Sequence, residues 1–461
     1  MKTSDFPVTA AKAEVVAAAL PIQDHWLPLS NLDLLLPPVD VGVFLCYGNK
    51  PRQPLPPFAH MVGVLKKALA QTLVLYYAFS GHLVGNAAGE PELLCDNSGV
   101  DFVEASADVE LEELDLYNPD ASVEGKLVPA RKRGVLAAQA TQLKCGGVVV
   151  AITFSHQVAD AYSANMFLLS WAEMARHAPP SLSPSFRRSV LLPRRPGDYH
   201  HSIDNMYVPI SSLPPPPDLS SDANPAAAVS RIYYIEADRI NELQTIANSN
   251  SGSRHSKLEA FCAFLWKIIA SGDAAAGNRF CRLGIVVDGR SRLIDGGDEN
   301  EAKLIRSYFG NVLSIPFGEL PTGDLKQNSL NWIADRIGEF LRPAATKEHF
   351  LGLIDWVEEH RPNTSVSKIY AAAEEEEAAA VVVSSGRHFP AGKLDFGWGP
   401  PAFGSYHFPW GGESGYVMPM PSPKENGDWV VYVHLVEPQL HLIETVGGHV
   451  FNRLSSHYLF S

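Results

Sequence analysis

Cysteine is scarce in this sequence of 461 residues, and no two cysteines form a Cys-x-x-Cys pair. The five cysteines are dispersed along the chain, at Cys46, Cys95, Cys145, Cys262 and Cys281. Dispersed thiols of this kind are typical of a reducing compartment, so a disulfide framework is not expected. A His-Glu-x-x-His motif is absent as well, and no bound metal is predicted.

Long apolar runs and an excess of positive charge are also missing. No stretch of about 18 apolar residues occurs, so we expect no transmembrane helix. Asp5, Lys12 and Glu14 surround the only apolar run near the N-terminus, a composition unlike that of a signal or transit peptide. A net charge of −14 gives no broad cationic surface for nucleic acid, although it permits a local basic pocket for a phosphorylated cofactor. We expect a cytosolic monomer that binds neither nucleic acid nor membrane.

Several well-known catalytic motifs are absent. The chain has no Gly-x-Ser-x-Gly nucleophile elbow and no phosphate-binding Walker loop. One segment, Gly397-x-Gly399-x-x-Ala402, matches the dinucleotide-binding fingerprint. Pro400 and Pro401 stand inside it, and no Val/Ile-rich strand leads into it. We therefore do not interpret this segment as a nucleotide-binding loop.

The length and the apolar patterning predict an α/β protein of two domains. A chain of 461 residues is too long for one compact core, and strand-like and helix-like segments alternate in both halves. The predicted strands cover residues 8–20, 41–47, 148–154, 230–235, 281–288, 312–316, 381–383, 429–435 and 440–445. The predicted helices cover residues 61–77, 161–176, 238–247, 256–270, 325–341 and 351–360.

Residues 179–229 differ from the rest of the chain because they are rich in proline and serine, with a proline run at 214–217. This composition predicts an extended segment without a core of its own, either a crossover between domains or a large surface loop. We place an N-terminal domain at residues 1–178 and a C-terminal domain at residues 230–461, with this linker between them.

A single imidazole, His156, stands where the β-branched run 148–154 ends and an amphipathic helix begins. Strand ends that lead into helices are frequent ligand sites in α/β folds. From this stretch alone, two interpretations are open: a functional site, or a core histidine at a strand end. Asp160, in the pattern His156-x-x-x-Asp160, also fits the N-cap of the following helix.

Three polar clusters in the second half of the chain accompany this motif. Asp288-Gly289-Arg290-Ser291-Arg292 follows a predicted strand, and Tyr308-Phe309-Gly310-Asn311 precedes another. Asp395-Phe396-Gly397-Trp398-Gly399 comes later. Each cluster alone is a weak signal. Together with His156-x-x-x-Asp160, in this order and spacing, they make the sequence resemble the plant BAHD acyltransferase family over essentially the whole chain.

Further segments strengthen the resemblance, among them Leu29-Ser30-Asn31-Leu32-Asp33 and the Gln142-x-x-Lys-Cys-Gly-Gly147 entry to the strand before His156. The N-terminal region is most similar to the branch that holds coniferyl alcohol acyltransferases and hydroxycinnamoyltransferases. The resemblance implies two similar-sized domains of the chloramphenicol-acetyltransferase type. Each would be a mixed β-sheet flanked by helices, with the active site in a channel between them.

The resemblance also implies transfer of an acyl group from a coenzyme A thioester to an alcohol or amine. A hydroxyl is a poor nucleophile at neutral pH, and a histidine of pKa near 6.5 can take its proton. We expect His156 to be this base and Asp160 to hold the loop through a pair with Arg290. Asp395 is a candidate catalytic residue, with a purely loop-holding role as the alternative because its glycines and Trp398 indicate close packing.

Acyl-coenzyme A is expected as a co-substrate, with no permanently bound cofactor. A helix N-terminus and strand-end arginines suit its phosphates and its pantetheine arm. Matched residue by residue, the family's contacts with coenzyme A fall on Ser256, Lys257, Leu258 and Glu259, on Asp288, Gly289, Arg290, Ser291 and Arg292, and on Ser384, Ser385, Gly386 and Arg387. Ser256 with Glu259 also fits a plain capping box, so that alternative stays open.

The sequence departs from the family pattern at several positions. Ala161 replaces the usual glycine, and Ser384-Ser385-Gly386 stands where shikimate-acylating members carry Thr-Ser-Trp. There the threonine and tryptophan help to hold the oxyanion, so here a hydroxyl is kept and an indole is lost. An arginine handle for a shikimate carboxylate is not found in the Ala/Glu-rich region.

From these observations we expect a hydroxycinnamoyl or acetyl group to be transferred to the hydroxyl of a plant specialised metabolite such as a phenylpropanoid alcohol. Two alternatives remain at this point: an N-acyltransferase that acts on an amine or polyamine, and a catalytically silent binding protein of the same fold.

Overall fold

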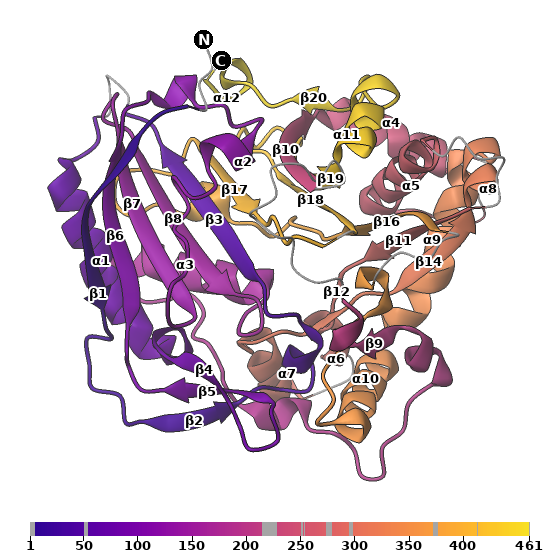
Figure 1. The fold of residues 1–461 in the computed structure, drawn as a ribbon, viewed down its shortest axis with the longest axis horizontal. Helices are drawn as coiled ribbons and strands as arrows, with labels where there is room; N and C mark the ends of the chain where they lie inside the picture. Colours follow the sequence, from indigo (N-terminus) through magenta and orange to yellow (C-terminus); the bar gives the residue numbers. More distant parts are fainter. Residues whose placement is uncertain are drawn as a thin grey trace.

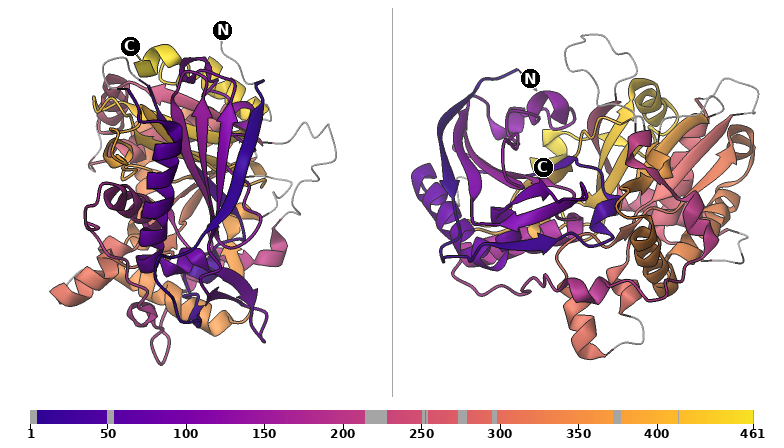
Figure 2. Two further views of the ribbon diagram at one scale, coloured as in Figure 1. Left: turned by 90° about the vertical axis from the view of Figure 1, so that its left-hand side faces the viewer. Right: turned by 60° about the horizontal axis from the view of Figure 1, so that its bottom comes forward.

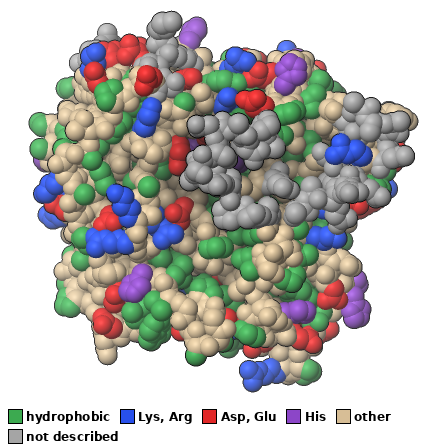
Figure 3. Space-filling view, viewed as in Figure 1, with side chains coloured by type: hydrophobic (Ala, Val, Ile, Leu, Met, Phe, Trp, Pro, Cys, Tyr) green, Lys and Arg blue, Asp and Glu red, His purple; other side chains and the backbone are tan. Residues whose placement is uncertain are grey.

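The structure is a computed structural model that describes residues 5–49, 54–213, 228–249, 252, 254–272, 279–294, 298–371, 377–412 and 414–460. Figure 1 shows two large β-sheets side by side, each covered by helices. The α/β class and the two sheet-and-helix units are therefore as predicted. On the face shown in Figure 3, acidic and basic side chains are interspersed, so the acidic excess of the chain does not form one continuous field there.

The first sheet has six strands in the order β1-β6-β7-β8-β3-β17. Its central strand β8 is buried on both faces along its whole length, which explains its nearly unbroken run of Val, Ile and Phe. The strands are β1 (Val8–Val16), β6 (Val100–Ala107), β7 (Leu136–Leu143), β8 (Val148–Ser155), β3 (Asp40–Tyr47) and β17 (Phe403–His407). Helices α1 (Phe58–Leu75) and α3 (Ala161–Ala175) pack against each other over this sheet.

Among the described residues, one helix is long enough and apolar enough to cross a membrane by length and composition alone, and it is α1. Its inner face, which includes Met61, Leu65 and Leu69, belongs to the first hydrophobic core. The left view of Figure 2 shows α1 alongside the strands of the first sheet. A core helix of a globular protein meets the same criterion.

The second sheet has seven strands in the order β14-β11-β16-β18-β19-β10-β20. These are β14 (Phe317–Pro321), β11 (Phe280–Ile285), β16 (Glu377–Val383), β18 (Gly415–Pro421), β19 (Trp429–Val436), β10 (Ala228–Ile235) and β20 (Asn452–Arg453). Helices α4 (Ala237–Ala247), α5 (Lys257–Ala270) and α9 (Leu330–Ala344) pack together beside this sheet. The predicted capping box opens α5, because the Ser256 hydroxyl accepts from the Glu259 amide and the Glu259 carboxylate accepts from the Ser256 amide.

Three predicted elements differ in the structure. Residues 440–445 belong to helix α11 (Glu437–Thr445), not to a strand; Leu440 and Ile443 are spaced to bury one helical face, and Pro438 fits the first turn. The helix predicted over 325–341 is two helices, α8 (Thr322–Gln327) and α9, because the backbone is extended at Asn328 and Ser329. The strand predicted over 312–316 is only the two-residue β13 (Leu313–Ser314), paired with β12 (Val287–Asp288).

Strand β17 crosses from the second half of the chain into the first sheet. It pairs antiparallel with β3, from Phe403 opposite Cys46 to His407 opposite Gly42. The predicted C-terminal domain of residues 230–461 is therefore not one spatial unit. The segment after Asp395 instead joins the two halves, a crossing that no local sequence pattern announces.

The described part of the linker 179–229 packs on the rest of the protein. Arg194 pairs with the buried carboxylate of Asp355 at 2.6 Å. Tyr207, in the short strand β9 (Tyr207–Pro209), packs on Trp356 of α10 (Lys347–His360). Residues 214–227, with the proline run, lie outside the described residues. The linker thus crosses between the halves while packing on α10.

Candidate active site

A cavity of about 1080 Å³ lies between the two sheets. The first unit contributes the loop before β3, the end of β8 and the start of α3. The second unit contributes the N-terminus of α5, the segment that follows β11, the end of β16 and strand β18. Segments that are far apart in the sequence therefore enclose one space, at the junction where the sequence predicted the active site.

His156 lines this cavity, just beyond the end of β8. Its backbone is fixed on both sides: the amide donates to the Val39 carbonyl at 2.9 Å, and its carbonyl accepts from the Asn311 side chain at 2.9 Å. The same Asn311 side chain also donates to the Asp33 carboxylate at 2.9 Å. The segments around Asp33 and Asn311, both noted in the sequence, thus meet behind the histidine and hold its backbone in place.

The environment of His156 favours the neutral imidazole. Burial lowers the pKa of His156 below its usual value, and this outweighs the opposing effects of the nearby backbone carbonyls and of the Asp160 carboxylate. Nδ1 of His156 is buried, while the residue as a whole is partly exposed, so Nε2 is the ring nitrogen available to the cavity. An unprotonated Nε2 can accept a proton.

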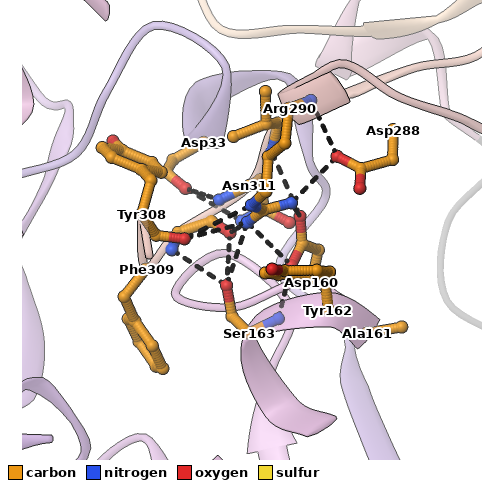
Figure 4. A network of polar contacts seen from close by, with 12 residues as sticks. Asp33, Asp160, Ala161, Tyr162, Ser163, Asp288, Arg290, Tyr308, Phe309 and Asn311 are labelled. Carbon is orange, nitrogen blue, oxygen red and sulfur yellow. Dashed lines mark hydrogen bonds and ion pairs between the residues drawn. The ribbon is translucent and has the colours of Figure 1, made fainter. Parts of the chain in front are cut away.

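Asp160 does not contact the imidazole in the structure. Its Oδ1 accepts from the Ser163 amide at 2.9 Å, which makes Asp160 the N-cap of α3. Its Oδ2 accepts from Arg290 Nη1 at 2.7 Å, so both interpretations of this residue hold at once (Figure 4). Asp160 and Arg290 are 1% and 2% exposed, which places this ion pair in the interior, where it joins the two halves of the chain.

The guanidinium of Arg290 is fully used within the protein. Besides Asp160, it donates to the Asp288 carboxylate, the Ser163 hydroxyl and the carbonyls of Tyr308 and Gly310. Burial acts to lower the pKa of Arg290, but the two carboxylates outweigh it and raise that pKa above its usual value. Arg290 therefore supports the site and has no N–H left for coenzyme A, which corrects its predicted second role.

The three segments predicted to contact coenzyme A come together at the cavity. Their lining members are Ser256, Lys257, Leu258, Glu259, Asp288, Arg290, Ser291, Arg292, Ser384, Ser385, Gly386 and Arg387. Gly289 is the exception. Its amide donates to the Val312 carbonyl at 2.8 Å, and a Cβ there would lie 2.5 Å from the Phe350 ring. Gly289 is needed for close packing on α10 and is not part of the lining.

Five exposed cations line the cavity among the described residues, and we call them the cationic lining: Lys257, Arg292, Arg306, Arg342 and Arg387. Arg306 pairs with Glu299 at 3.0 Å, an exposed contact that leaves its charge accessible. Sequence reasoning missed Arg306, the last residue of α7 (Glu299–Arg306), and Arg342, in the last turn of α9, because they belong to no motif. Together the five form a local positive patch on an acidic protein.

The cavity has a second, uncharged part, which we call the aromatic lining: Tyr370, Phe408, Trp410 and Tyr416. Trp410 packs edge-on against Tyr370 at 5.0 Å, and Phe408 against Tyr416 at 4.9 Å between ring centroids. The Phe408 ring also meets the His156 ring edge-on at 6.1 Å. Sequence reasoning did not find this group, because Tyr370 is distant in the sequence and the spacing of Phe408, Trp410 and Tyr416 matches no motif.

Asp395 is not among the residues that line the cavity. Its Oδ1 accepts from the amides of Gly397 at 2.7 Å and Gly399 at 2.8 Å. Gly397 and Gly399 have φ values of +111° and +96°, which only glycine adopts readily, so the loop depends on them. This position contradicts the predicted catalytic role of Asp395 and agrees with the loop-holding alternative.

Gly386 explains the lost indole in structural terms. A Cβ at this position would lie 2.5 Å from Met420 Cγ and 3.2 Å from Met418 Cγ. Both methionines come from β18 and line the cavity. Thioether side chains, which adapt to irregular spaces, therefore occupy the volume next to Gly386, and a larger side chain has no room there.

Comparison with known proteins agrees with this geometry. The Transferase family matches residues 6–449. An omega-hydroxypalmitate O-feruloyl transferase of Arabidopsis thaliana is 28% identical over 385 residues, which is 81% of this chain and 78% of that protein. A shikimate O-hydroxycinnamoyltransferase of Nicotiana tabacum is 27% identical over 441 residues, 93% of this chain and 96% of that protein.

Solved structures share the fold. Vinorine synthase superposes with a TM-score of 0.69 at 21% identity, covering 98% of this chain and all of that one. TRI101 of F. graminearum, complexed with coenzyme A and T-2 mycotoxin, superposes with a TM-score of 0.74 at 15% identity over 93% of this chain and 99% of that one. With a family match over nearly its whole length, this chain belongs to the Transferase family, the BAHD acyltransferases, and is an acyl-coenzyme A-dependent acyltransferase.

Proposed function

We propose that the protein transfers an acyl group from acyl-coenzyme A to the hydroxyl of an uncharged aromatic alcohol, with His156 as the general base. One observation carries the proposal: the lining of the cavity that holds His156 includes both exposed cations and uncharged aromatic rings. The cations suit a polyphosphate donor, and the rings suit a neutral aromatic acceptor.

The chemistry needs one proton acceptor and no covalent acyl-enzyme. Nε2 of His156 takes the proton of the acceptor hydroxyl as the oxygen attacks the thioester carbonyl. Such general-base catalysis typically raises the rate by about 10²–10⁴-fold. When the C–S bond breaks, the same His156 returns this proton to the leaving sulfur. A thiol has a pKa near 8.5, so its anion leaves without a stronger acid.

The cationic lining supports acyl-coenzyme A as the donor. Phosphate oxygens form charge-assisted hydrogen bonds with Lys and Arg, which are roughly twice as strong as neutral ones. Lys257 stands at the first position of α5, where the helix N-terminus adds a favourable dipole for an anion. That the related TRI101 was crystallised with coenzyme A supports the same donor class here.

The aromatic lining supports a neutral aromatic acceptor over a charged one. Apolar residues from β3, β8 and other segments complete it: Leu36, Val39, Val41, Phe154 and Ile315. None of these five residues could pair with a carboxylate or an ammonium group. An unpaired charge buried against them would be strongly disfavoured. A phenylpropanoid alcohol therefore fits better than shikimate or a polyamine.

Two other functions remain as outcomes of the test. One relative is an anthranilate N-benzoyltransferase of Dianthus caryophyllus, so an amine acceptor belongs to the panel. A silent binding protein would keep the cavity and release no thiol. We further propose that the protein works as a monomer and that it is cytosolic. Its five free cysteines support the cytosolic location, because such thiols persist in a reducing compartment.

The deciding experiment crosses acyl donors with acceptors. Feruloyl-, coumaroyl- and acetyl-coenzyme A are each incubated with coniferyl alcohol, shikimate, quinate, anthranilate and a polyamine, while free thiol and acylated product are followed. We expect the highest kcat/KM with the neutral aromatic alcohol. If no acceptor gives thiol release faster than buffer does, the proposed transferase activity is contradicted. If a carboxylate or amine acceptor is preferred, the proposed acceptor class is contradicted.

A further inference from the structure

The reaction needs a hydrogen-bond donor that the motifs do not supply. Negative charge develops on the thioester carbonyl oxygen as the acceptor attacks, and a preorganised donor at that oxygen is usually the largest single contribution to catalysis. Next to Ser384 and Ser385 stands Gly386, which has no side chain, and the methionines beside it carry no donor. Ser384 keeps a hydroxyl, and a second donor in place of the indole must come from elsewhere in the lining.

Two of the phenols that line the cavity are already committed. Tyr406 donates to the side-chain oxygen of Asn165 at 2.8 Å, and Tyr162 donates to the Arg306 carbonyl at 2.8 Å. Their protons point at protein acceptors and not at a ligand. Tyr370 and Tyr416 remain among the described lining phenols.

Strand pairing brings Tyr416 next to Ser384. Strands β16 and β18 run parallel with Val382 opposite Tyr416, and the Ser384 amide donates to the Val417 carbonyl at 2.9 Å. Because side chains alternate along a strand, Tyr416 and Ser384 share the face that looks toward the first unit. Val417, on the other face, belongs to the second hydrophobic core.

This pairing brings the Ser384 hydroxyl beside the Tyr416 phenol, where it acts to lower the phenol's pKa as a hydrogen-bond donor would. If Ser384 donates to the phenol oxygen, the phenol proton of Tyr416 is left for a ligand. Burial raises the pKa of Tyr416 to about 12, so the phenol keeps its proton throughout the neutral range and acts as a donor. The Phe408 ring contacts both the Tyr416 ring and the His156 ring, so Tyr416 and the base flank one side chain of the lining.

We propose that Tyr416, oriented by Ser384, donates a hydrogen bond to the oxyanion of the tetrahedral intermediate. This inference rests on the proposed function. In the first step the acceptor oxygen bonds to the carbonyl carbon, His156 takes its proton, and the carbonyl π electrons move to the oxygen that Tyr416 stabilises. In the second step those electrons re-form the carbonyl, the C–S bond breaks, and the sulfur receives the proton from His156.

The test is Tyr416→Phe, which removes the hydroxyl and keeps the ring that packs on Phe408. We expect kcat to fall about 10²–10³-fold, the cost typical of losing one oxyanion donor, with both KM values unchanged. Ser384→Ala should cause a smaller loss, because the phenol is kept but loses its orienting partner. Tyr234→Phe is the control, because it removes a phenol that stacks on Tyr458 outside the cavity lining, and it should leave kcat unchanged.

A binding measurement separates this role from a structural one. A thioether analogue of acyl-coenzyme A, with CH₂ in place of the carbonyl, cannot form an oxyanion, so its affinity by calorimetry should be the same for wild type and Tyr416→Phe. Weaker binding in proportion to the lost kcat would overturn the proposal, as would an unchanged kcat. If Tyr416→Phe stays fully active while His156→Ala does not, the inference fails and the proposed function stands; if wild type transfers no acyl group, both fail.

Discussion

The cationic and the aromatic linings of the cavity differ in what they can recognise. The cationic lining consists of flexible, exposed side chains such as Lys257 and Arg292, which suit a charged handle common to every acyl-coenzyme A. The aromatic lining consists of rings packed edge-on, such as Tyr370 on Trp410. Such rings select an acceptor by its shape and disfavour a charged one. The difference teaches that donor binding and acceptor choice depend on different side chains of the cavity that His156 lines.

Arg290 joins the two halves of the chain that carry these linings, so its loss should have the largest effect. Arg290→Met would leave the Asp160 carboxylate buried without its partner, and we expect a loss of about 3–5 kcal/mol in the free energy of unfolding. Activity toward donor and acceptor should fall together. Denaturant unfolding with parallel kinetics measures both quantities. Arg239→Met, which breaks an exposed pair with Glu242, should cost at most about 1 kcal/mol. Equal effects of the two variants would contradict an interior role of Arg290.

The cationic lining is tested by the double variant Lys257→Ala/Arg292→Ala. Each charged hydrogen bond is worth about 1.5–3 kcal/mol, so losing one or two of them should raise the KM for acyl-coenzyme A by roughly 10²-fold. The KM for the acceptor should stay the same. Acyl-pantetheine, which lacks the phosphates, serves as the control donor, and its KM should be insensitive to the double variant. A parallel rise with acyl-pantetheine would show that these side chains do not bind the phosphates.

The aromatic lining is tested by Trp410→Ala, which should have the opposite pattern. Losing the ring contact, worth about 0.5–1.5 kcal/mol beyond its burial, should raise the acceptor KM roughly 10-fold and leave the KM for acyl-coenzyme A unchanged. Steady-state kinetics with the best aromatic alcohol measure this. Trp26→Ala, at a tryptophan that is 53% exposed in β2 (His25–Pro28), is the control and should change neither value. A larger change in the donor KM than in the acceptor KM would overturn the division into two linings.

The pH dependence should show the smallest effect. The neutral form of His156 is the active one, and burial lowers its pKa, so kcat/KM should be lost only as pH falls below about 6.5 and should stay level from pH 7 to 8. His388 also lines the cavity, and its pKa is lowered by burial and by Arg387. Because the acid limb is assigned to His156, kcat/KM of His388→Gln should fall at the same acidic pH as that of the wild type. An acid limb above pH 7 would contradict the desolvated environment of His156.

The sequence predicted those parts of the fold and site that local patterns encode. The buried strand before His156, the N-cap at Asp160 and the capping box at Ser256 each follow from residue types at fixed spacing. The contact between Asp160 and Arg290 was expected from the family resemblance, and the structure contains it. Short-range signals are reliable because the chain forms these features within a few residues.

The remaining features depend on tertiary contacts that the sequence does not display. The aromatic lining assembles rings such as Phe408 and Tyr416 across two sheets, and β17 reaches the first sheet from the far end of the chain. Residues 440–445 were predicted as a strand because a short apolar run fits either element, and packing of Leu440 and Ile443 settles it as a helix. Asp395 stands in a prominent motif and still holds only its own loop.

The most direct test of the central claim is single-turnover acyl transfer by His156→Ala, with the best donor and acceptor pair at saturating concentration. Product formation should be slower by about 10²–10⁴-fold than in wild type, while calorimetry shows unchanged binding of coenzyme A. Transfer by His156→Ala at the wild-type rate would contradict the account, because the proton of the acceptor would then have to leave by another route.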